Sequence, residues 1–396
     1  MTPLQHIELT EYSSEEFEIN EIEYAIGETL WRNYDQKVQQ VTVDFPTPKT
    51  GNKWKLTAKG WVGHIPVTPD FHLSLLPKVP LGNLFGMLDY AYKLKSFRFL
   101  PGLVNCESLE EFYNNLAHVL AQRILDRCRK GFYRAYLPKT GNLAYVRGRL
   151  DMRQTIQKPW EVKLKCHYEE HTADIEENQI LAWTLFIILR SGLCKERVLP
   201  KLRQAYHTLQ GLVTLKSFKP EDCIGRNYHR LNEDYQPLHA LCRFFLENTG
   251  PSHEKGDRTM LPFLIDMAKL YELFVAEWLK ENLPSHLFVK FQERINISDR
   301  ISFKTDIVLY ENSTGNPRYI LDTKYKTSNS PAPDDVRQVI AYAVSKECQE
   351  VILVYPTSLT YPLDTLIGNI RTRSLTFSLN SNLEDAGKSF LKELFS

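Results

Sequence analysis

The chain has almost no net charge. Its 396 residues include 49 Lys and Arg and 48 Asp and Glu, which gives +1 at pH 7. A protein that binds nucleic acid unaided normally carries a strong basic field. Any contact with nucleic acid is therefore expected to come from a local basic patch, or from a partner that supplies the affinity.

The chain also lacks long apolar runs and paired cysteines. Its longest apolar run, residues 180–189, is too short to span a bilayer, and the acidic N-terminus has no signal-like apolar segment. Without a Cys-x-x-Cys pair, the dispersed cysteines indicate reduced thiols rather than disulfides or a zinc site. These cysteines are residues 106, 128, 166, 194, 223, 242 and 348. We expect a cytoplasmic protein with no membrane contact.

No Gly-x-x-x-x-Gly-Lys-Ser/Thr sequence is present. Because that motif cradles phosphates in P-loop proteins, the chain is not expected to hydrolyse GTP itself. Internal repeats and low-complexity tracts are also absent. A hydrophobic fraction of 43% and a charged fraction of 24% are those of a globular protein, and the length allows two or three domains.

The periodicity divides the chain into three regions of a mixed α/β protein. Residues 1–80 are expected to be β-rich and to form a small barrel or sandwich. Residues 81–250 are mainly helical, with a two-strand excursion around 143–166. A polar loop at 248–257 marks the best domain boundary.

Residues 258–396 are expected to form a compact α/β domain. The patterns predict a first helix over 261–282 and a second over 334–345. The strands are expected at 287–291, 302–310, 318–324 and 350–355.

Two acids in this last region stand beside apolar strand segments. Asp306 precedes Ile-Val-Leu, and Asp322 follows Tyr-Ile-Leu and is followed two residues later by Lys324. Alternate residues of a strand share a face, so Asp322 and Lys324 point the same way. If the two strands pair, Asp306 can meet Asp322 at one end of the sheet. Two carboxylates beside a lysine suit a hard cation and phosphodiester hydrolysis.

Other interpretations of this motif remain open. A salt bridge at a strand end, from Asp322 to Lys324 or Lys326, would explain the same residues without catalysis. Glu161-Val-Lys163 shows the same spacing with Asp151 upstream, but no apolar strand leads into Glu161. Neighbouring helices favour Asp322 instead, because one carries Glu272 and the other places Gln338 and Tyr342 on one face.

This order of elements resembles the PD-(D/E)xK nuclease superfamily. Its core runs from a helix with Glu to a strand with Asp, a strand with Asp-x-Lys and a final helix. Thr305 stands where the superfamily usually has proline, a position that holds no ligand. The Gln338-x-x-x-Tyr342 pair resembles the RecB-like subset.

Longer segments resemble the McrC family, the nuclease subunits of modification-dependent McrBC restriction systems. The resemblance covers roughly residues 70–355 and is weakest over the first 70 residues. Its segments are Ser74–Ala91, Arg147–Asp151, Glu177–Leu181, Pro262–Val275, Leu321–Lys326 and Gln338–Ala343.

The resemblance implies a set of roles for the candidate site. Asp306, Asp322 and the backbone carbonyl of Thr323 would hold Mg²⁺, for which Mn²⁺ is a possible substitute. Glu272 would complete the metal site directly or through water. Lys324 would orient the attacking water or stabilise the transition state. Gln338 would contact the DNA backbone or the water network.

The resemblance also implies an endonuclease that is active only in a complex. The partner would be a hexameric McrB-like AAA+ GTPase that brings double-stranded, methylated DNA and GTP, and residues 81–250 would dock it. Arg147 or Arg149 could reach the partner's nucleotide, although charges that protect an exposed strand edge explain them better. The alternatives are a stand-alone repair or recombination nuclease and a non-catalytic activator of an AAA+ partner.

A local phosphate-binding patch around the site is a further prediction. Its candidate residues are Lys304, Lys326, Arg337, Arg371 and Arg373.

Overall fold

The computed structural model describes residues 6–36, 39–68, 70–92, 108–158, 160–250, 253–255, 258–296, 302–326 and 328–396. The chain divides into two compact units, one combining Met1–Phe112 with Asn248–Ser396 and the other consisting of Tyr113–Glu247. Both units contain helices and strands, which confirms the predicted mixed α/β class. The expected domain limits of 1–80, 81–250 and 258–396 stay a prediction. Among the described residues, no helix is long and apolar enough to cross a membrane.

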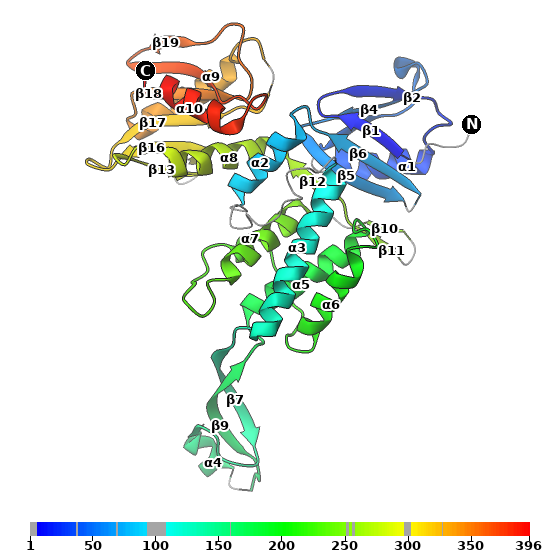
Figure 1. Cartoon of the computed structure of the whole chain (residues 1–396), viewed down its shortest axis with the longest axis vertical. Coiled ribbons are helices and arrows are strands. Elements are labelled where there is room, and N and C mark those ends of the chain that lie inside the picture. The colour runs from blue at the N-terminus through cyan, green and yellow to red at the C-terminus, as the bar shows by residue number, and fades with distance from the viewer. Residues whose placement is uncertain are drawn as a thin grey trace. The chain divides into compact units, whose positions relative to one another are not determined.

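Two small sheets share one hydrophobic core in the N-terminal part of the first unit (Figure 1). One sheet has the strand order β1-β6-β5-β12 and the other β2-β4-β3. Alternating side chains from both sheets, such as Val41, Leu56 and Leu73, fill the core between them. The first six strands are β1 (His6–Thr10), β2 (Ser14–Phe17), β3 (Val41–Asp44), β4 (Trp54–Ala58), β5 (Trp61–Thr68) and β6 (Phe71–Leu76). We call these strands with β12 the N-terminal β region.

The helix predicted over 261–282 begins later than expected. Its first residues form β12 (Phe263–Asp266), which pairs antiparallel with β5. The pairing needs a glycine, because a Cβ at Gly63 (φ +149°) would lie 2.0 Å from the Phe263 carbonyl oxygen. Asp266 then accepts hydrogen bonds from the backbone N–H groups of Ala268 and Lys269 and begins α8 (Met267–Asn282). One continuous segment therefore joins the N-terminal sheet to the helix that carries Glu272.

A six-stranded sheet with the order β13-β16-β17-β18-β20-β19 forms the centre of residues 267–396, the C-terminal α/β region. The strand pairs β17–β18 and β18–β20 are parallel, and the other neighbours are antiparallel. The strands are β13 (Leu287–Phe291), β16 (Ile307–Glu311), β17 (Pro317–Thr323), β18 (Glu350–Tyr355), β19 (Asp364–Ile367) and β20 (Ile370–Thr376). The pattern did not indicate β19, β20 or α10 (Leu383–Leu394).

Helices cover the sheet of this region (Figure 1). Buried residues of α9 (Pro333–Lys346), among them Val339 and Tyr342, pack against alternate residues of β16, β17 and β18. Trp278 of α8 and Phe390 of α10 pack against Phe377, which follows β20. The sheet is therefore buried, as expected for its apolar parallel strands.

The described residues of the second unit form mainly long helices and one protruding hairpin (Figure 1). Ser108 accepts a hydrogen bond from the Glu111 N–H group and so caps the first of these helices. The helices are α3 (Leu109–Lys130), α5 (Glu176–Ser191), α6 (Leu199–Gln210) and α7 (Tyr235–Asn248).

The hairpin is longer than the predicted excursion at 143–166. β7 (Ala135–Leu143) pairs with β9 (Leu164–Thr172) along its whole length, and β8 (Arg149–Leu150) and α4 (Met152–Gln157) lie near its end. We call residues 135–172 the arm. Few of its side chains are buried, so the sequence shows no alternation of apolar and polar residues from which its length could be predicted.

A buried polar cluster holds the helices of the second unit together. Asn178 donates to the carbonyl oxygens of Tyr133 and Ala173, and it accepts from the Tyr235 hydroxyl at 2.6 Å. The Glu-Asn-Gln segment that resembles the McrC family therefore contains a residue with a structural role. Full satisfaction of such buried groups favours one packing arrangement.

Protonation of His239 in this cluster should destabilise the chain. The side chain accepts from the Tyr228 hydroxyl and donates to the Glu177 carbonyl, and burial lowers its pKa to about 4. Because the unfolded chain binds this proton near pH 6.5, the contribution of His239 is present above that pH and lost as pH falls toward 4. We expect a loss of about 3 kcal/mol over this range, measured by urea unfolding.

The matched control is His239→Gln. Its free energy of unfolding should change less between pH 6.5 and 4.5 than that of the wild type. His64, whose pKa is also lowered to about 4 by burial, is unchanged in both proteins. An equal pH dependence of wild type and variant would contradict the assignment to His239.

Candidate active site

The predicted acids meet at the C-terminal end of β17. Asp322 is the penultimate residue of this strand, and Asp306 lies in the break between β15 (Ser302–Lys304) and β16. Thr323 donates to one Asp306 oxygen, Oδ2, from its backbone N–H at 2.8 Å and its hydroxyl at 3.0 Å. The charge of Asp306 is close enough to raise the pKa of Asp322. The structure therefore brings together the two acids that lie 16 residues apart in sequence.

The strand predicted over 302–310 is interrupted at Thr305 and Asp306. There, the Gln292 N–H donates to the Asp306 carbonyl, and the Thr305 N–H donates to the Glu293 carbonyl. The interruption turns the Asp306 carboxylate toward Thr323. A continuous strand would have placed Asp306 by simple alternation.

Asp322 is the most deeply buried charged group of the site. Only 1% of the residue is exposed, and Lys324 Nζ lies 2.6 Å from its Oδ2 atom. Burial, and then the charge of Asp306, raise the pKa of Asp322 to about 7. Burial alone would lower the pKa of Lys324, but the neighbouring Asp322 outweighs this effect and the pKa is raised. The lysine is therefore charged at neutral pH.

Residues of α9 hold Lys324 from the other side. Its ammonium donates to Gln338 Oε1 at 3.1 Å, and the Gln338 amide donates to the Tyr342 hydroxyl at 2.6 Å. Asp335 lies 3.8 Å from Lys324 Nζ and also pairs with Lys326. Asp335 was not among the predicted site residues, although it precedes Gln338 by three residues in the first turn of the same helix.

Glu272 stands on α8 beside these groups. Burial, and then the charge of Asp306, raise its pKa, and Gln292 Nε2 donates to its Oε1 atom at 3.1 Å. Gln292 has a left-handed backbone (φ +54°), which is uncommon for a residue other than glycine and frequent at functional sites. Gln292 thus contacts Glu272 by its side chain and Asp306 by its backbone. No motif in the sequence indicated this residue.

The acids do not form a ready three-acid cluster. Within the part of the chain that the structure describes, no group of three or more His, Cys, Asp or Glu side chains is arranged to hold a metal ion. Lys324 on Asp322 and Gln292 on Glu272 satisfy these carboxylates instead. The metal-binding roles predicted for Asp306, Asp322, Thr323 and Glu272 stay predictions.

The predicted basic patch is only partly supported. Arg373 is 4% exposed, pairs with Glu350 and donates to the carbonyl oxygens of Glu393 and Leu394, so its prediction as a surface phosphate ligand is wrong. Lys304 is exposed beside the site. The other three candidates pair with acids: Lys326 with Asp335, Arg337 with Asp334, and Arg371 with Asp364.

Removing the ammonium group should destabilise the protein. In Lys324→Met, the buried Asp322 carboxylate loses its partner, and we expect about 3 kcal/mol lower stability at pH 8, measured by urea unfolding. Adding Asp322→Asn removes the uncompensated charge and should recover most of this loss. Equal stabilities of the single and double variants would contradict a buried ion pair.

Comparison with known proteins gives this geometry a context. A family model described as McrBC 5-methylcytosine restriction system component matches residues 56–356. The type IV methyl-directed restriction enzyme EcoKMcrBC of Escherichia coli (strain K12) is 24% identical over 220 residues. This match covers 53% of the present chain and 61% of that protein's length.

One solved structure shows a similar fold, and a second is also matched. One is a refined half-complex from a tetradecameric assembly of Thermococcus gammatolerans McrB AAA+ hexamers with bound McrC. A chain of it matches with a TM-score of 0.58 and 19% identity, covering 98% of this chain and 99% of that one. A cryo-EM structure of the Thermococcus gammatolerans McrBC complex matches with a TM-score of 0.46 and 21% identity, over 71% and 88% of the two chains. The family model spans most of the sequence, and the chain belongs to the family of McrBC 5-methylcytosine restriction system components.

Proposed function

We propose that this chain is the DNA-cleaving subunit of a McrBC-type complex and hydrolyses phosphodiester bonds of double-stranded, methylated DNA. The observation that carries the proposal is the grouping of Asp306, Asp322 and Lys324 at one end of β17. Glu272 and Gln338 flank this group. A structural salt bridge alone would need Asp322 and Lys324 but not the second acid.

The donor chemistry fits Mg²⁺, or Mn²⁺ in its place. Two neighbouring carboxylates, one of them buried, repel each other, and a small cation relieves that repulsion. Mg²⁺ needs only one or two carboxylates because it retains several waters. Asp306, Asp322 and the Thr323 carbonyl would hold it, with Glu272 bound directly or through water. When bound, the metal polarises the phosphate and lowers the pKa of a water ligand.

The remaining residues position charge around the phosphate. Thr323 fixes one oxygen of Asp306, and Gln338 restrains the ammonium of Lys324. Lys324 is then ready to orient the attacking water or to stabilise the negative charge of the transition state. Tyr342 supports Gln338 and is a positioning residue.

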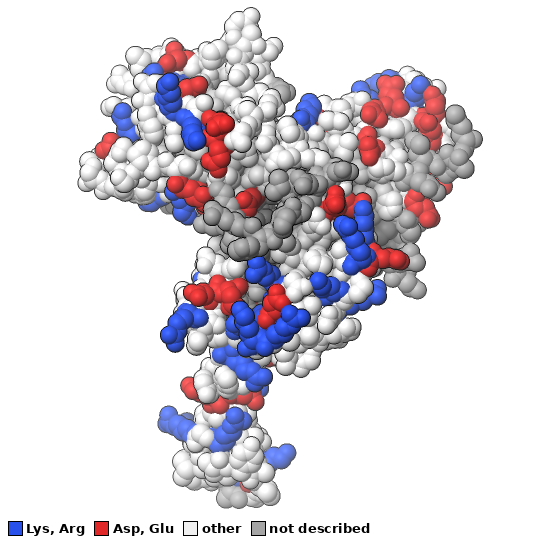
Figure 2. Space-filling view, viewed as in Figure 1, with Lys and Arg blue, Asp and Glu red and all other residues white. Residues whose placement is uncertain are grey.

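A partner is needed for DNA affinity and GTP. Acidic and basic side chains are intermixed on the face shown in Figure 2, in agreement with the net charge of +1. The solved half-complex contains McrB AAA+ hexamers, and we assign to this chain an equivalent hexameric GTPase whose activity it stimulates. GTP is bound by that partner.

The arm is the part of the second unit best suited to dock this partner. Its end exposes six large apolar side chains, each at least 58% exposed, and such surfaces mark protein interfaces. They are Tyr145, Val146, Met152, Ile156, Trp160 and Val162. Arg149 is exposed nearby, whereas Arg147 stacks on the Tyr168 ring at 4.4 Å.

Asp306→Ala should abolish cleavage of methylated plasmid by the chain with its AAA+ partner, GTP and Mg²⁺. Loss of one of the two central acids should slow cutting by about a hundredfold or more, because charge stabilisation of this kind contributes that much. GTPase stimulation should be preserved, since it depends on docking. Gel electrophoresis and phosphate release measure the two activities.

Asp334→Ala is the matched control, because Asp334 is an exposed acid of α9. It should cut like the wild type. Cutting without the partner would favour a stand-alone nuclease. If the wild type never cuts under these conditions but stimulates GTP hydrolysis, the chain is an activator without nuclease activity.

Loss of the apolar arm surface should weaken partner binding. We expect Ile156→Ser with Trp160→Ser to raise the Kd for the AAA+ partner by about tenfold or more, because large apolar anchors dominate interfaces. Leu366→Ser is the control, since Leu366 is 71% exposed on β19. Titration calorimetry measures the affinity of each variant for the partner. Equal affinities of the arm variant and Leu366→Ser would exclude the arm as the docking surface.

A further inference from the structure

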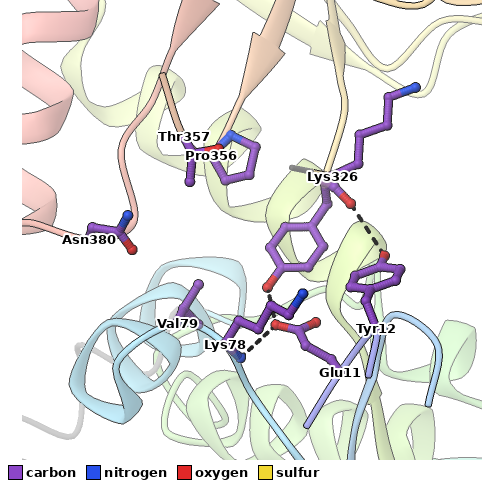
Figure 3. A pocket seen from close by; sticks show the side chains of 9 residues that line it. Glu11, Tyr12, Lys78, Val79, Lys326, Pro356, Thr357 and Asn380 are labelled. Carbon is purple, nitrogen blue, oxygen red and sulfur yellow. Dashed lines mark hydrogen bonds between the residues drawn. The ribbon is translucent and has the colours of Figure 1, made fainter. Parts of the chain in front are cut away.

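A cavity of about 210 Å³ lies beside the end of β17 that carries the acids (Figure 3). Tyr325 and Lys326, which help to line it, directly follow Lys324 in the chain. An extended chain advances by about 3.3 Å per residue, and Tyr325 is the third residue after Asp322, so the cavity begins within roughly 10 Å of Asp322 along the chain. Each DNA strand advances by about 3.4 Å per nucleotide. The cavity is thus within about three nucleotides of a phosphate held by Asp306 and Asp322.

The walls of the cavity suit a flat heterocycle. Tyr325 is one of the lining residues and offers an aromatic ring. The ring of Pro356 and the side chain of Val79 contribute apolar surface, and Asn380 and Thr357 contribute polar groups (Figure 3). The volume is below the roughly 300–1,000 Å³ of pockets that enclose a whole small-molecule ligand. The occupant is therefore a part of a larger molecule. Asparagine amides pair with the edges of bases, and extruded bases bind between aromatic or apolar side chains.

Hydrogen bonds between distant parts of the first unit hold the cavity in shape. Glu11 is fully buried, and its Oε1 atom accepts from the Tyr325 hydroxyl at 2.7 Å and from the Lys78 N–H at 2.8 Å. Tyr12 has a left-handed backbone (φ +57°), and its hydroxyl donates to the Tyr325 carbonyl at 3.4 Å. A Cβ at Gly60 would lie 2.3 Å from the Tyr12 hydroxyl, so the sequence leaves room for this tyrosine. Uncommon backbone of this kind is frequent at binding sites.

We propose that this cavity receives one extruded nucleobase of the DNA strand, within about three nucleotides of the phosphate that is cut. The inference rests on the proposed nuclease function and adds a subsite to it. The Asn380 amide pairs with an edge of the base, while Tyr325 and Pro356 form its walls. The exposed Lys78 lies at the cavity, where it can pair with the adjoining phosphate. Binding the base fixes the strand across the acids and involves no bond making or breaking.

A double-mutant cycle that combines Asn380→Ala in the protein with removal of one base from the DNA tests the proposal. The probes are duplexes that carry one abasic nucleotide at successive positions around the mapped cut. Each duplex is bound to the full complex of this chain with its partner and GTP. In that complex, Asn380→Ala should weaken the affinity for intact DNA and slow its cutting by about tenfold. When the abasic nucleotide stands at the position of the bound base, the affinity and cutting rate of the wild type should fall to those of Asn380→Ala on intact DNA. The affinity and rate of Asn380→Ala should not fall further on that duplex, because the substitution and the missing base remove the same contact.

Val79→Trp, which fills the cavity, gives a second measurement. It should cut intact DNA slowly, and on the duplex with the abasic nucleotide at that same position it should cut as fast as the wild type cuts that duplex. Asn316→Ala is the matched control, because Asn316 is exposed in the turn before β17, at the opposite end of the strand. It should behave like the wild type on every duplex.

The outcomes separate this inference from the nuclease proposal. If the effects of Asn380→Ala and of the abasic nucleotide add at every position, or if Val79→Trp binds and cuts intact DNA normally, no base enters the cavity. If the wild type binds but never cuts, the nuclease proposal fails. The affinity cycle, scanned over the whole duplex, then still decides whether a base is bound.

Discussion

The buried ion pair between Lys324 and Asp322 is the interaction on which the rest of the site depends. A carboxylate that is 1% exposed cannot remain ionised without a partner, and burial together with Asp306 already raises its pKa to about 7. Lys324 supplies the balancing charge at 2.6 Å. Neighbouring residues then modify each member of the pair. Gln338 accepts a hydrogen bond from Lys324, and the charge of Asp306 raises the pKa of Asp322. The same arrangement explains how the buried Asp322 and the partly buried Asp306 remain close together.

Local backbone irregularities determine where these groups point. The break before β16 turns Asp306 toward Thr323, and the left-handed backbone of Gln292 lets one residue contact both Glu272 and the Asp306 backbone. Upstream, β12 continues into α8, so the helix that carries Glu272 starts from the N-terminal sheet. The N-terminal β region also contacts the end of β17 through Glu11 and Tyr325. This region is thus part of the structural support of the site.

The sequence predicted much of the local structure correctly. The helices at α5, α7 and α9 and the strands at β17 and β18 follow strong apolar periodicity, which depends on near neighbours in the chain. The grouping of Asp306 with Asp322 was also predictable. The two strands are antiparallel neighbours, so the start of β16 and the end of β17 lie at the same end of the sheet. The helix start at 261 was wrong, since pairing of β12 with β5 involves residues about 200 positions apart. The surface role of Arg373 was wrong because the helix end that buries it, at Glu393 and Leu394, lay in a tail with a weak pattern.

The sequence by itself determined the chemistry: which acids, lysine and amide stand beside apolar strands, and in which order. Alternation along a strand and periodicity along a helix are local properties, so no folded structure is needed to read them. Only the tertiary structure decided which partners these groups have. Gln292 reaches Glu272, Glu11 reaches Tyr325, and Asp335 approaches Lys324 because distant segments pack together. The cavity beside β17 has the same origin, since its walls come from five separated parts of the chain. Burial, and with it the raised pKa of Asp322, is likewise a property of packing and not of residue order.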